Sequence, residues 1–360
     1  NGIMRILSAK HIIAATIGSA LIVGCTSGPA GPGAATAVPA TAARTATAAA
    51  KTAAPLKPVT LTLNFLAGGP QIGFMYAKKL GYYKEAGLDV TIQEGQGSAT
   101  TAQLLATGKT EIGFADAPAI MSVRAKGGAI RIIAPILQTD GFAIMSLKES
   151  NLTTVKALAG KKIAVQAGTA QPALLDAIFL ANGMDKNQVN IVNIDPSALV
   201  GSLLQKQVDA ILGGADFQGV QLADRGVQIN TLYYKDIGVP TVGLSLAASE
   251  DLIKKDPDML SKFVAASLKG WDAARKNPTA GAQAILEQFP AAGNAAQFQK
   301  QAQIDFQVLC GPGATKLGLV PAANWTKTYE LLTKYQGLPA DKPITEYYTD
   351  QFVPKDGPGC

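Results

Sequence analysis

Two aspartates at matching positions along the chain are the strongest candidates for contacts with a ligand. Asp116 follows Ser98 by 18 residues and Asp216 follows Ser197 by 19 residues, with a Leu-Leu pair and an isoleucine inside each interval. If the repetition reflects two related halves, the two carboxyl groups face one another across a cleft. A buried carboxylate needs hydrogen-bond donors, which an amino-pyrimidine or a ribityl chain would supply. The alternatives are a chance repetition and, for Asp116, capping of the helix that Pro118 opens.

Small residues at the ends of strands form a second group of candidates. Gly97 and Ser98 lie where a predicted strand gives way to a helix, and free backbone amides there suit a carboxylate, a sulfonate or a ring oxygen. Thr169, followed by Gln171, offers the same geometry in the second half of the chain. The alternative interpretation of Ser98 is that its hydroxyl only caps the helix.

Aromatic and amide side chains near the strand ends are placed to recognise a flat ring. Phe65, preceded by Asn64, follows the first predicted strand, and Phe217 follows a later one. Both phenylalanines are candidates to stack on the ring, although a Phe near a strand can equally belong to the core. Gln71 is a candidate to bond the edge of the ring. Gln138 lies where the chain first crosses between the halves, and it either contacts the ligand or belongs to a flexing segment.

Histidine content and charge exclude several functional classes. The only histidine, His11, falls in a segment that we expect to be removed, so the mature chain has no imidazole for Ser-His-Asp or Cys-His catalysis or for metal binding. We therefore expect no enzyme, no metal and no cofactor. The net charge of +6 arises mainly from five basic residues within the first 57, because without them 27 basic residues face 26 acidic ones. A near-neutral domain argues against nucleic acid as a partner.

The N-terminus has the pattern of a secretory signal. A basic start precedes an apolar stretch over 12–23, and Cys25 follows Ile22-Val23-Gly24. The stretch is too short to span a bilayer comfortably. A cysteine at this place resembles the bacterial lipobox, whose cysteine receives a lipid; the alternative is a chance cysteine in an ordinary signal. We expect residues 1–24 to be removed, residues 25–58 to form a disordered tether, and the domain to lie outside the cytoplasm, anchored to the cell membrane by lipidated Cys25.

Short β-branched runs alternate with helical stretches through the rest of the chain. This alternation predicts parallel βαβ units and an α/β fold. Crossings of the chain near 139–150 and 238–245 would connect two hinged lobes, one formed by 59–142 plus 243–360 and the other by 143–242. Ligands of open α/β sheets bind beyond the carboxyl ends of the strands, so we expect a cleft between the lobes. Further helices are predicted over 257–275, 278–288, 295–309 and 321–336.

Two cysteines remain besides Cys25. Cys310 and Cys360 would pair in an oxidising exterior and pin the C-terminal tail. The alternative is that the terminal cysteine stays free. Composition alone leaves both possibilities open.

A series of motifs in a fixed order resembles the NMT1/THI5-like solute-binding proteins of ABC importers. The matching blocks are 81–90 (GYYKEAGLDV), 95–98 (GQGS), 103–108 (QLLATG), 112–117 (IGFADA), 158–165 (LAGKKIAV) and 348–352 (YTDQF). The resemblance covers residues 59–353. It implies a two-lobed periplasmic-binding-protein fold of type II, a ligand captured without chemical change, and an ABC permease and ATPase as partners of a monomer.

The ligands known for this family leave the specificity open. Members bind thiamine pyrimidine precursors, riboflavin, alkanesulfonates, taurine or nitrate. Two acids in the cleft favour a small planar heterocycle, such as a thiamine pyrimidine precursor or riboflavin, over ligands that have no donors. The alternatives are a small organic anion such as an alkanesulfonate, and a receptor that presents its ligand to a signalling partner. A fungal pyrimidine synthase of this fold consumes its own histidine, and a mature chain without histidine argues against that activity.

Overall fold

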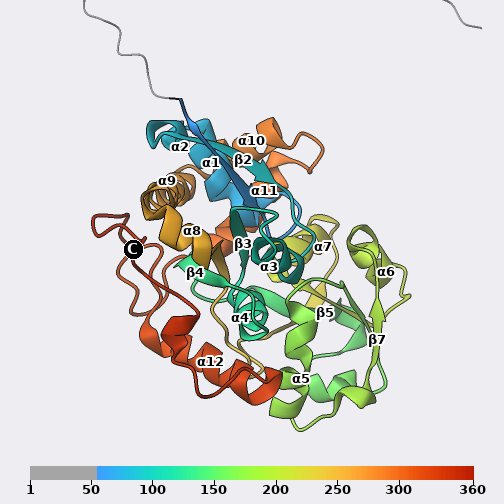
Figure 1. Cartoon of the computed structure of the whole chain (residues 1–360). Coiled ribbons are helices and arrows are strands. Elements are labelled where there is room, and N and C mark those ends of the chain that lie inside the picture. Colours follow the sequence, from blue (N-terminus) through green and yellow to red (C-terminus); the bar gives the residue numbers. More distant parts are fainter. Residues whose placement is uncertain (1–54) are drawn as a thin grey trace, which may run out of the picture. The chain divides into compact units, whose positions relative to one another are not determined.

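Two five-stranded sheets, each covered by helices, organise the described part of the chain (Figure 1). The structure is a computed structural model and describes residues 55–360. The signal predicted over 1–24, Cys25 and the tether as far as residue 54 lie outside the described residues. The alternation of strands and helices confirms the predicted α/β class.

The strands of the two sheets come from different stretches of the chain. The first sheet has the order β2-β1-β3-β10-β4 and the second has the order β7-β6-β8-β5-β9. The bounds are β1 Lys57–Thr62, β2 Leu88–Gln93, β3 Ile112–Asp116, β4 Ile130–Pro135 and β10 Leu244–Ser249 in the first sheet, and β5 Phe142–Leu147, β6 Lys162–Val165, β7 Asn190–Asn193, β8 Ala210–Gly214 and β9 Ile229–Tyr233 in the second. We call each sheet with the helices packed on it the first and the second half.

The first strand begins inside the predicted tether. The tether was expected to extend to residue 58, but Lys57 and Pro58 pair with Leu88 and Asp89 of β2. The backbone amide of Lys57 also donates to the carbonyl of Gly87 at 2.9 Å. Pairing with β2 therefore extends β1 toward the N-terminus, which the composition of residues 25–58 did not indicate.

One strand in each sheet runs against its neighbours, whereas the sequence predicted parallel units. β5 is antiparallel to β8 and β9, and β10 is antiparallel to β3 and β4. These are the two strands that the chain enters directly from the other sheet. No crossover within the same sheet leads into either strand, so the βαβ rule that makes neighbouring strands parallel does not apply to them.

The two connections between the sheets lie side by side. One leads from β4 to β5 and the other from β9 to β10. The amide of Asp140 in the first connection donates to the carbonyl of Thr241 in the second at 3.3 Å, and the amide of Gly243 donates to the carbonyl of Leu137 at 3.2 Å. Two short paired segments that join two packed halves are the geometry of a hinge.

Helices cover both sheets and supply most of the core. Phe74 of α1 packs edge-to-face on Phe114 of β3 and on Trp271 of α9, with ring centroids 4.7 and 5.7 Å apart. All three side chains are fully buried, and aromatic side chains of this size dominate core energetics. The helices are α1 Ile72–Lys79, α2 Tyr82–Glu85, α3 Ser98–Ala106, α4 Ala117–Ala125, α5 Gln171–Ala181, α6 Leu199–Leu204, α7 Val220–Asp224, α8 Glu250–Lys255, α9 Pro257–Lys276, α10 Pro278–Gln288, α11 Ala295–Phe306 and α12 Ala322–Gln336.

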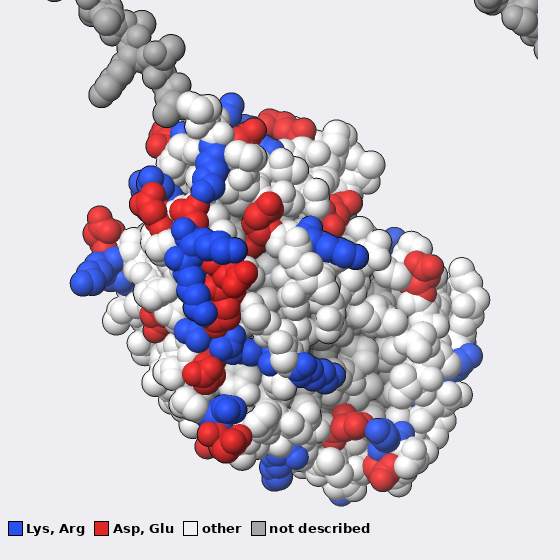
Figure 2. All heavy atoms as spheres, in the orientation of Figure 1, with Lys and Arg blue, Asp and Glu red and all other residues white. Residues whose placement is uncertain are grey.

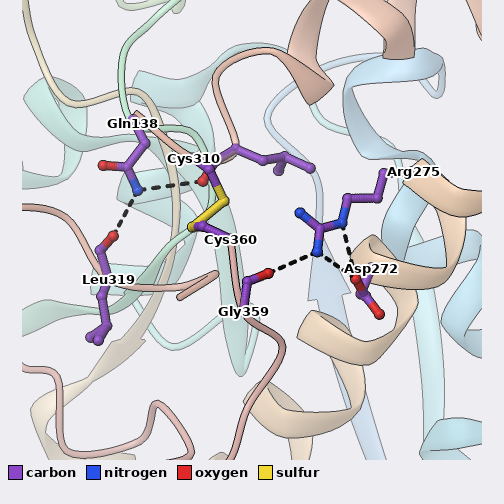
Figure 3. Close-up of a disulfide and its surroundings, with 8 residues drawn as sticks. Gln138, Asp272, Arg275, Cys310, Leu319, Gly359 and Cys360 are labelled. Atoms are coloured by element: carbon purple, nitrogen blue, oxygen red, sulfur yellow. Dashed lines mark hydrogen bonds and ion pairs between the residues drawn. A yellow bond between two sulfur atoms is a disulfide. The ribbon is translucent and has the colours of Figure 1, made fainter. Parts of the chain in front are cut away.

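A disulfide joins the C-terminal tail to the segment that follows α11. It links Cys310 to Cys360 (Figure 3), the pairing that the sequence left open. Beside it, the side-chain amide of Gln138 donates to the carbonyls of Leu319 at 2.7 Å and Leu309 at 3.4 Å. Gln138 is thus turned toward the C-terminal segment and holds it against the first connection between the sheets.

Charged side chains of both signs are interspersed on the face drawn in Figure 2. Among the described residues, Arg124 pairs with Glu250 and Lys262 pairs with Asp258, each at 2.7 Å. A clustered basic surface of the kind that nucleic acid requires is not seen on this face. Within residues 55–360, no helix has both the length and the apolar character needed to cross a bilayer.

Candidate ligand-binding site between the two sheets

A cavity lies where loops from both sheets meet. Its volume is about 60 Å³, room for a handful of water molecules. Ten of the eleven residues that the sequence singled out as ligand contacts line it: Asn64, Phe65, Gln71, Gly97, Ser98, Asp116, Thr169, Gln171, Asp216 and Phe217. The eleventh, Gln138, does not line it, because its side chain bonds the C-terminal segment instead. Most of these residues follow the carboxyl ends of strands, where open α/β sheets bind ligands.

Ser98 and Asp116 form a buried pair at the floor of the first half. The hydroxyl of Ser98 donates to Oδ2 of Asp116 at 2.6 Å, and the backbone amide of Asp116 donates back to the Ser98 oxygen at 3.1 Å. Neither side chain caps a helix, so the capping alternative is wrong for both residues. Burial raises the pKa of Asp116 to about 8, against the opposing effect of the Ser98 hydrogen bond.

Two of the backbone amides at the start of α3 are not free, although free amides were predicted there. The amides of Ala99 and Thr100 both donate to the carbonyl of Gly168 in the second half, at 2.9 and 3.2 Å. Gly97 makes this approach possible, because a Cβ built on it would lie 2.3 Å from that carbonyl oxygen and because its φ is +121°. The halves are therefore in direct backbone contact beside the cavity.

Thr169 has a different geometry from the one predicted. Its hydroxyl donates to the carbonyl of Gln166 at 2.8 Å, which closes the turn between β6 and α5. Helix α5 begins at Gln171, two residues later, so Thr169 is not at a helix start equivalent to that of α3. The second half contributes a carbonyl to the contact with α3 where the sequence predicted an anion-binding amide.

Asp140 is a cavity residue that sequence reasoning missed. It lies in the first connection between the sheets, lines the cavity, and is 4% exposed. Its carboxylate accepts hydrogen bonds from the Thr241 hydroxyl and from the amide of Phe142, the latter at 3.1 Å. Burial raises its pKa to about 7. The sequence feature that could have identified Asp140 is an acid followed by Gly141 at the crossing between the halves. It lies two residues beyond Gln138, which was predicted to contact the ligand instead.

The acids share the cavity with amide oxygens that have no partner. Gln71 donates to Asn64 at 2.8 Å, which leaves its own Oε1 buried and unbonded. Oε1 of Gln171 is also buried without a partner, and both glutamines line the cavity. Burial raises the pKa of Asp216 to about 6. Buried oxygens of this kind are normally satisfied by donors, so a ligand that donates hydrogen bonds would satisfy these two amide oxygens.

No basic side chain lines the cavity among the described residues. The remaining lining residues, which the sequence did not indicate, are Pro70, Leu137, Gly141, Phe142, Gln166, Gly214, Gln218 and Leu244, in addition to Asp140. The same part of the chain holds no group of three or more His, Cys, Asp or Glu residues placed to bind a metal ion.

Two phenylalanines from opposite halves meet at the edge of the cavity. Phe65 follows β1 and Phe217 follows β8, and their rings meet edge-to-face with centroids 5.4 Å apart. Both are only partly buried. The sequence predicted that each would stack on a ligand ring; here they contact each other and close one side of the cavity.

Comparison with known proteins gives the family. The model of the family described as NMT1/THI5 like matches residues 70–281. The riboflavin-binding protein RibY of Chloroflexus aurantiacus is 26% identical over 325 residues, which cover 86% of this chain and 92% of that protein. A formylaminopyrimidine-binding protein of Halalkalibacterium halodurans is 25% identical over 216 residues, covering 59% of this chain and 65% of that protein.

Solved structures confirm the two-lobed fold. The alkanesulfonate-binding protein SsuA of Xanthomonas axonopodis pv. citri, solved with MOPS bound, superposes with a TM-score of 0.64 at 15% identity, covering 83% of this chain and 100% of that one. A likeness at this identity carries the fold, which is that of the periplasmic binding proteins. The family match extends over more than half of the chain. The chain therefore belongs to the NMT1/THI5-like family.

Proposed function

We propose that this chain is the extracytoplasmic solute-binding component of an ABC importer and that it captures a small planar heterocycle rich in hydrogen-bond donors. The observation that carries the proposal is the cavity itself, enclosed by both halves and lined by three aspartates and two unpartnered amide oxygens. A ligand that donates hydrogen bonds would satisfy these acceptors. A ligand that only accepts hydrogen bonds would leave these acceptor oxygens unpaired, and each buried unsatisfied group costs about 1–3 kcal/mol.

The size and charge of the cavity narrow the ligand class. A cavity of about 60 Å³ is smaller than the roughly 150 Å³ that holds a benzene ring. The halves must therefore open to admit even one substituted ring, and a three-ring flavin with a ribityl chain would need a larger separation. Without a lysine or arginine in the lining, a sulfonate or nitrate would have no counter-charge. We therefore favour an amino-pyrimidine of the thiamine-precursor class over riboflavin and over an alkanesulfonate.

The mechanism proposed is capture by closure. The ligand enters between the separated halves, and the two connections at the hinge allow them to close over it. Closure needs a ligand that binds the closed form better than the open form. The closed monomer would then dock on a permease and its ATPase, with lipidated Cys25 holding the domain at the membrane and no bond made or broken in the ligand.

Isothermal titration calorimetry of the full chain tests this proposal. The probes are 4-amino-5-hydroxymethyl-2-methylpyrimidine, riboflavin and MOPS. We expect the pyrimidine to bind most tightly. Asp140→Asn should weaken it about tenfold or more, since a hydrogen bond to a charged group contributes about 1.5–3 kcal/mol. The control is Asp251→Asn on α8, an aspartate whose side chain is 80% exposed and which does not line the cavity. Tight binding of MOPS with no binding of either heterocycle would refute the proposal.

A further inference from the structure

A second acid contacts the cavity carboxyl of Asp216 from outside the cavity. Asp216 follows β8 in the second half, and Asp305 is near the end of α11, which packs on α10 in the first half. Their carboxyl groups are within hydrogen-bonding reach of each other, and α11 packs on the turn that carries Asp216. Asp305 is 1% exposed and does not line the cavity. This contact therefore joins the two halves. It lies directly behind Asp216, whose side chain faces the cavity.

The contact requires a proton, because nothing near it supplies a counter-charge. Neither aspartate forms an ion pair with a Lys or Arg among the described residues. The charged groups facing Asp216 are Asp116 and Asp140, both acids. The basic residue of α11 in this region, Lys300, pairs with Asp224 of α7 at the surface. Two ionised carboxylates in such a place would repel strongly.

The proton belongs on Asp305. Burial raises the pKa of Asp305 well above the usual range, and the charge of Asp216 raises it further. Burial raises the pKa of Asp216 only to about 6, because the hydrogen bond from Asp305 favours its ionised form. At neutral pH, Asp305 thus donates to the Asp216 carboxylate. The second oxygen of Asp305, Oδ2, is buried with no partner, so this bond is the interaction that fixes the side chain.

The surroundings show that α11 is the surface on which the Asp216 turn rests. Gln301, one helical turn before Asp305, accepts a hydrogen bond from the amide of Gly69 at 2.9 Å. The neighbouring Gly68 approaches the ring of Phe217 so closely that an added Cβ would lie 2.8 Å from it. The loop after β1, the turn after β8 and α11 are therefore packed together.

We propose that Asp305 is a positioning residue that aims the Asp216 carboxylate into the cavity and holds the two halves closed through their shared proton. The part of this inference that concerns ligand affinity rests on the proposed function; the part that concerns closure does not. Because the proton is bound more tightly in the closed form, its contribution is full below the pKa that Asp305 has in the open form and declines progressively above it. It is lost as pH rises and Asp305 ionises.

Asp305→Asn separates this role from simple packing. A carboxamide has nearly the shape of the protonated acid and donates to Asp216 at every pH. Affinity for 4-amino-5-hydroxymethyl-2-methylpyrimidine is measured by calorimetry for wild type and variant at about pH 7 and about pH 9.5. We expect the ratio of wild-type to variant affinity to fall at least about tenfold over this interval. The ratio of the two affinities cancels the effect that ionisation of Asp116 and Asp140 has on binding, because both proteins contain these two aspartates.

Two further variants complete the set. Asp305→Leu has no donor and should bind at least about tenfold more weakly than Asp305→Asn at both pH values. Asp224→Asn removes the exposed pair between Asp224 of α7 and Lys300 of α11 and should follow the wild-type curve, since exposed pairs contribute little. Parallel pH curves for wild type and Asp305→Asn would overturn the proposal.

Two measurements on the ligand-free protein keep the test independent of ligand identity. Small-angle X-ray scattering should show an increase in the radius of gyration of wild type at alkaline pH that Asp305→Asn does not show. Carbon-13 NMR of aspartate-labelled wild type should show one carboxyl that keeps its proton well above neutral pH and is absent from the variant spectrum. Failure of the pyrimidine to bind, with both of these results obtained, would refute the proposed ligand and leave the acid pair standing. An Asp305 that titrates in acid would refute the pair.

Discussion

Replacing Asp116 by Asn should stabilise the ligand-free protein at neutral pH and leave its stability in acid almost unchanged. The carboxyl is buried beside Ser98, and burial raises its pKa from 3.8 to about 8. Between these values the unfolded chain has released a proton that the folded protein still holds. A group whose folded pKa is raised stabilises the fold below its unfolded pKa, and that contribution is lost as pH rises through the folded pKa. Asn resembles the protonated acid and does not titrate.

The size of the effect follows from the distance between the two pKa values. At pH 7 the relevant interval runs from 3.8 to 7, which is about 3 pH units at about 1.36 kcal/mol each, or about 4 kcal/mol. Water that reaches the cavity stabilises the charged form and reduces this figure. We therefore expect Asp116→Asn to raise the free energy of unfolding by about 2–4 kcal/mol at pH 7, and by less than about 1 kcal/mol at pH 4.

Urea unfolding of the two proteins at both pH values measures this difference. Asp251→Asn on α8 is the control, because its side chain is 80% exposed and forms only a surface pair with Lys255; it should match wild type at both pH values. The same Asp116→Asn protein should bind ligand more weakly, so that stability and affinity change in opposite directions. A difference between wild type and variant that stays constant from pH 4 to pH 7 would refute the reasoning.

Two other substitutions test contacts that hold the halves and the tail. Gly97→Ala should keep the halves apart, because a methyl group would lie 2.3 Å from the Gly168 carbonyl oxygen; scattering should show a larger radius of gyration and calorimetry a weaker affinity. Gly108→Ala is its control, since a Cβ there meets nothing within 4 Å although φ is also positive. Cys310→Ser should lower the free energy of unfolding, because the bond to Cys360 spans 50 residues and a loop of that size implies about 4 kcal/mol of chain entropy. Reductant should destabilise wild type and not the variant.

The cavity wall could be predicted from local sequence because the α/β rule concerns strand ends. Asn64 and Phe65 follow β1, Asp116 ends β3, and Asp216 and Phe217 follow β8. The alternation of strands and helices locates these positions without knowledge of how the halves pack. The long C-terminal helices were also predicted, since capping residues and proline mark their starts, as Asp256 and Asn277 do for α9 and α10.

The rest depended on contacts between segments far apart in the chain. Asp140 becomes a cavity residue only because its connection lies against the one containing Thr241. Asp305, on a helix about 90 residues after Asp216, looks like any acid of an amphipathic helix until the turn after β8 rests on it. Gln138 was chosen for its place at the crossing, but the C-terminal segment that takes its hydrogen bonds is about 180 residues away.

The closed contact between the halves also bears on which ligands the cavity excludes. Free amides at the start of α3 are the natural site for an anion in a fold of this kind. Here Ala99 and Thr100 donate theirs to the Gly168 carbonyl of the other half. An anion seated on those amides would have to displace that carbonyl and would be repelled by its oxygen. Closure and anion binding therefore compete for the same two hydrogen bonds. A ligand that donates to the acids leaves those bonds in place, so closing the halves favours donors over anions.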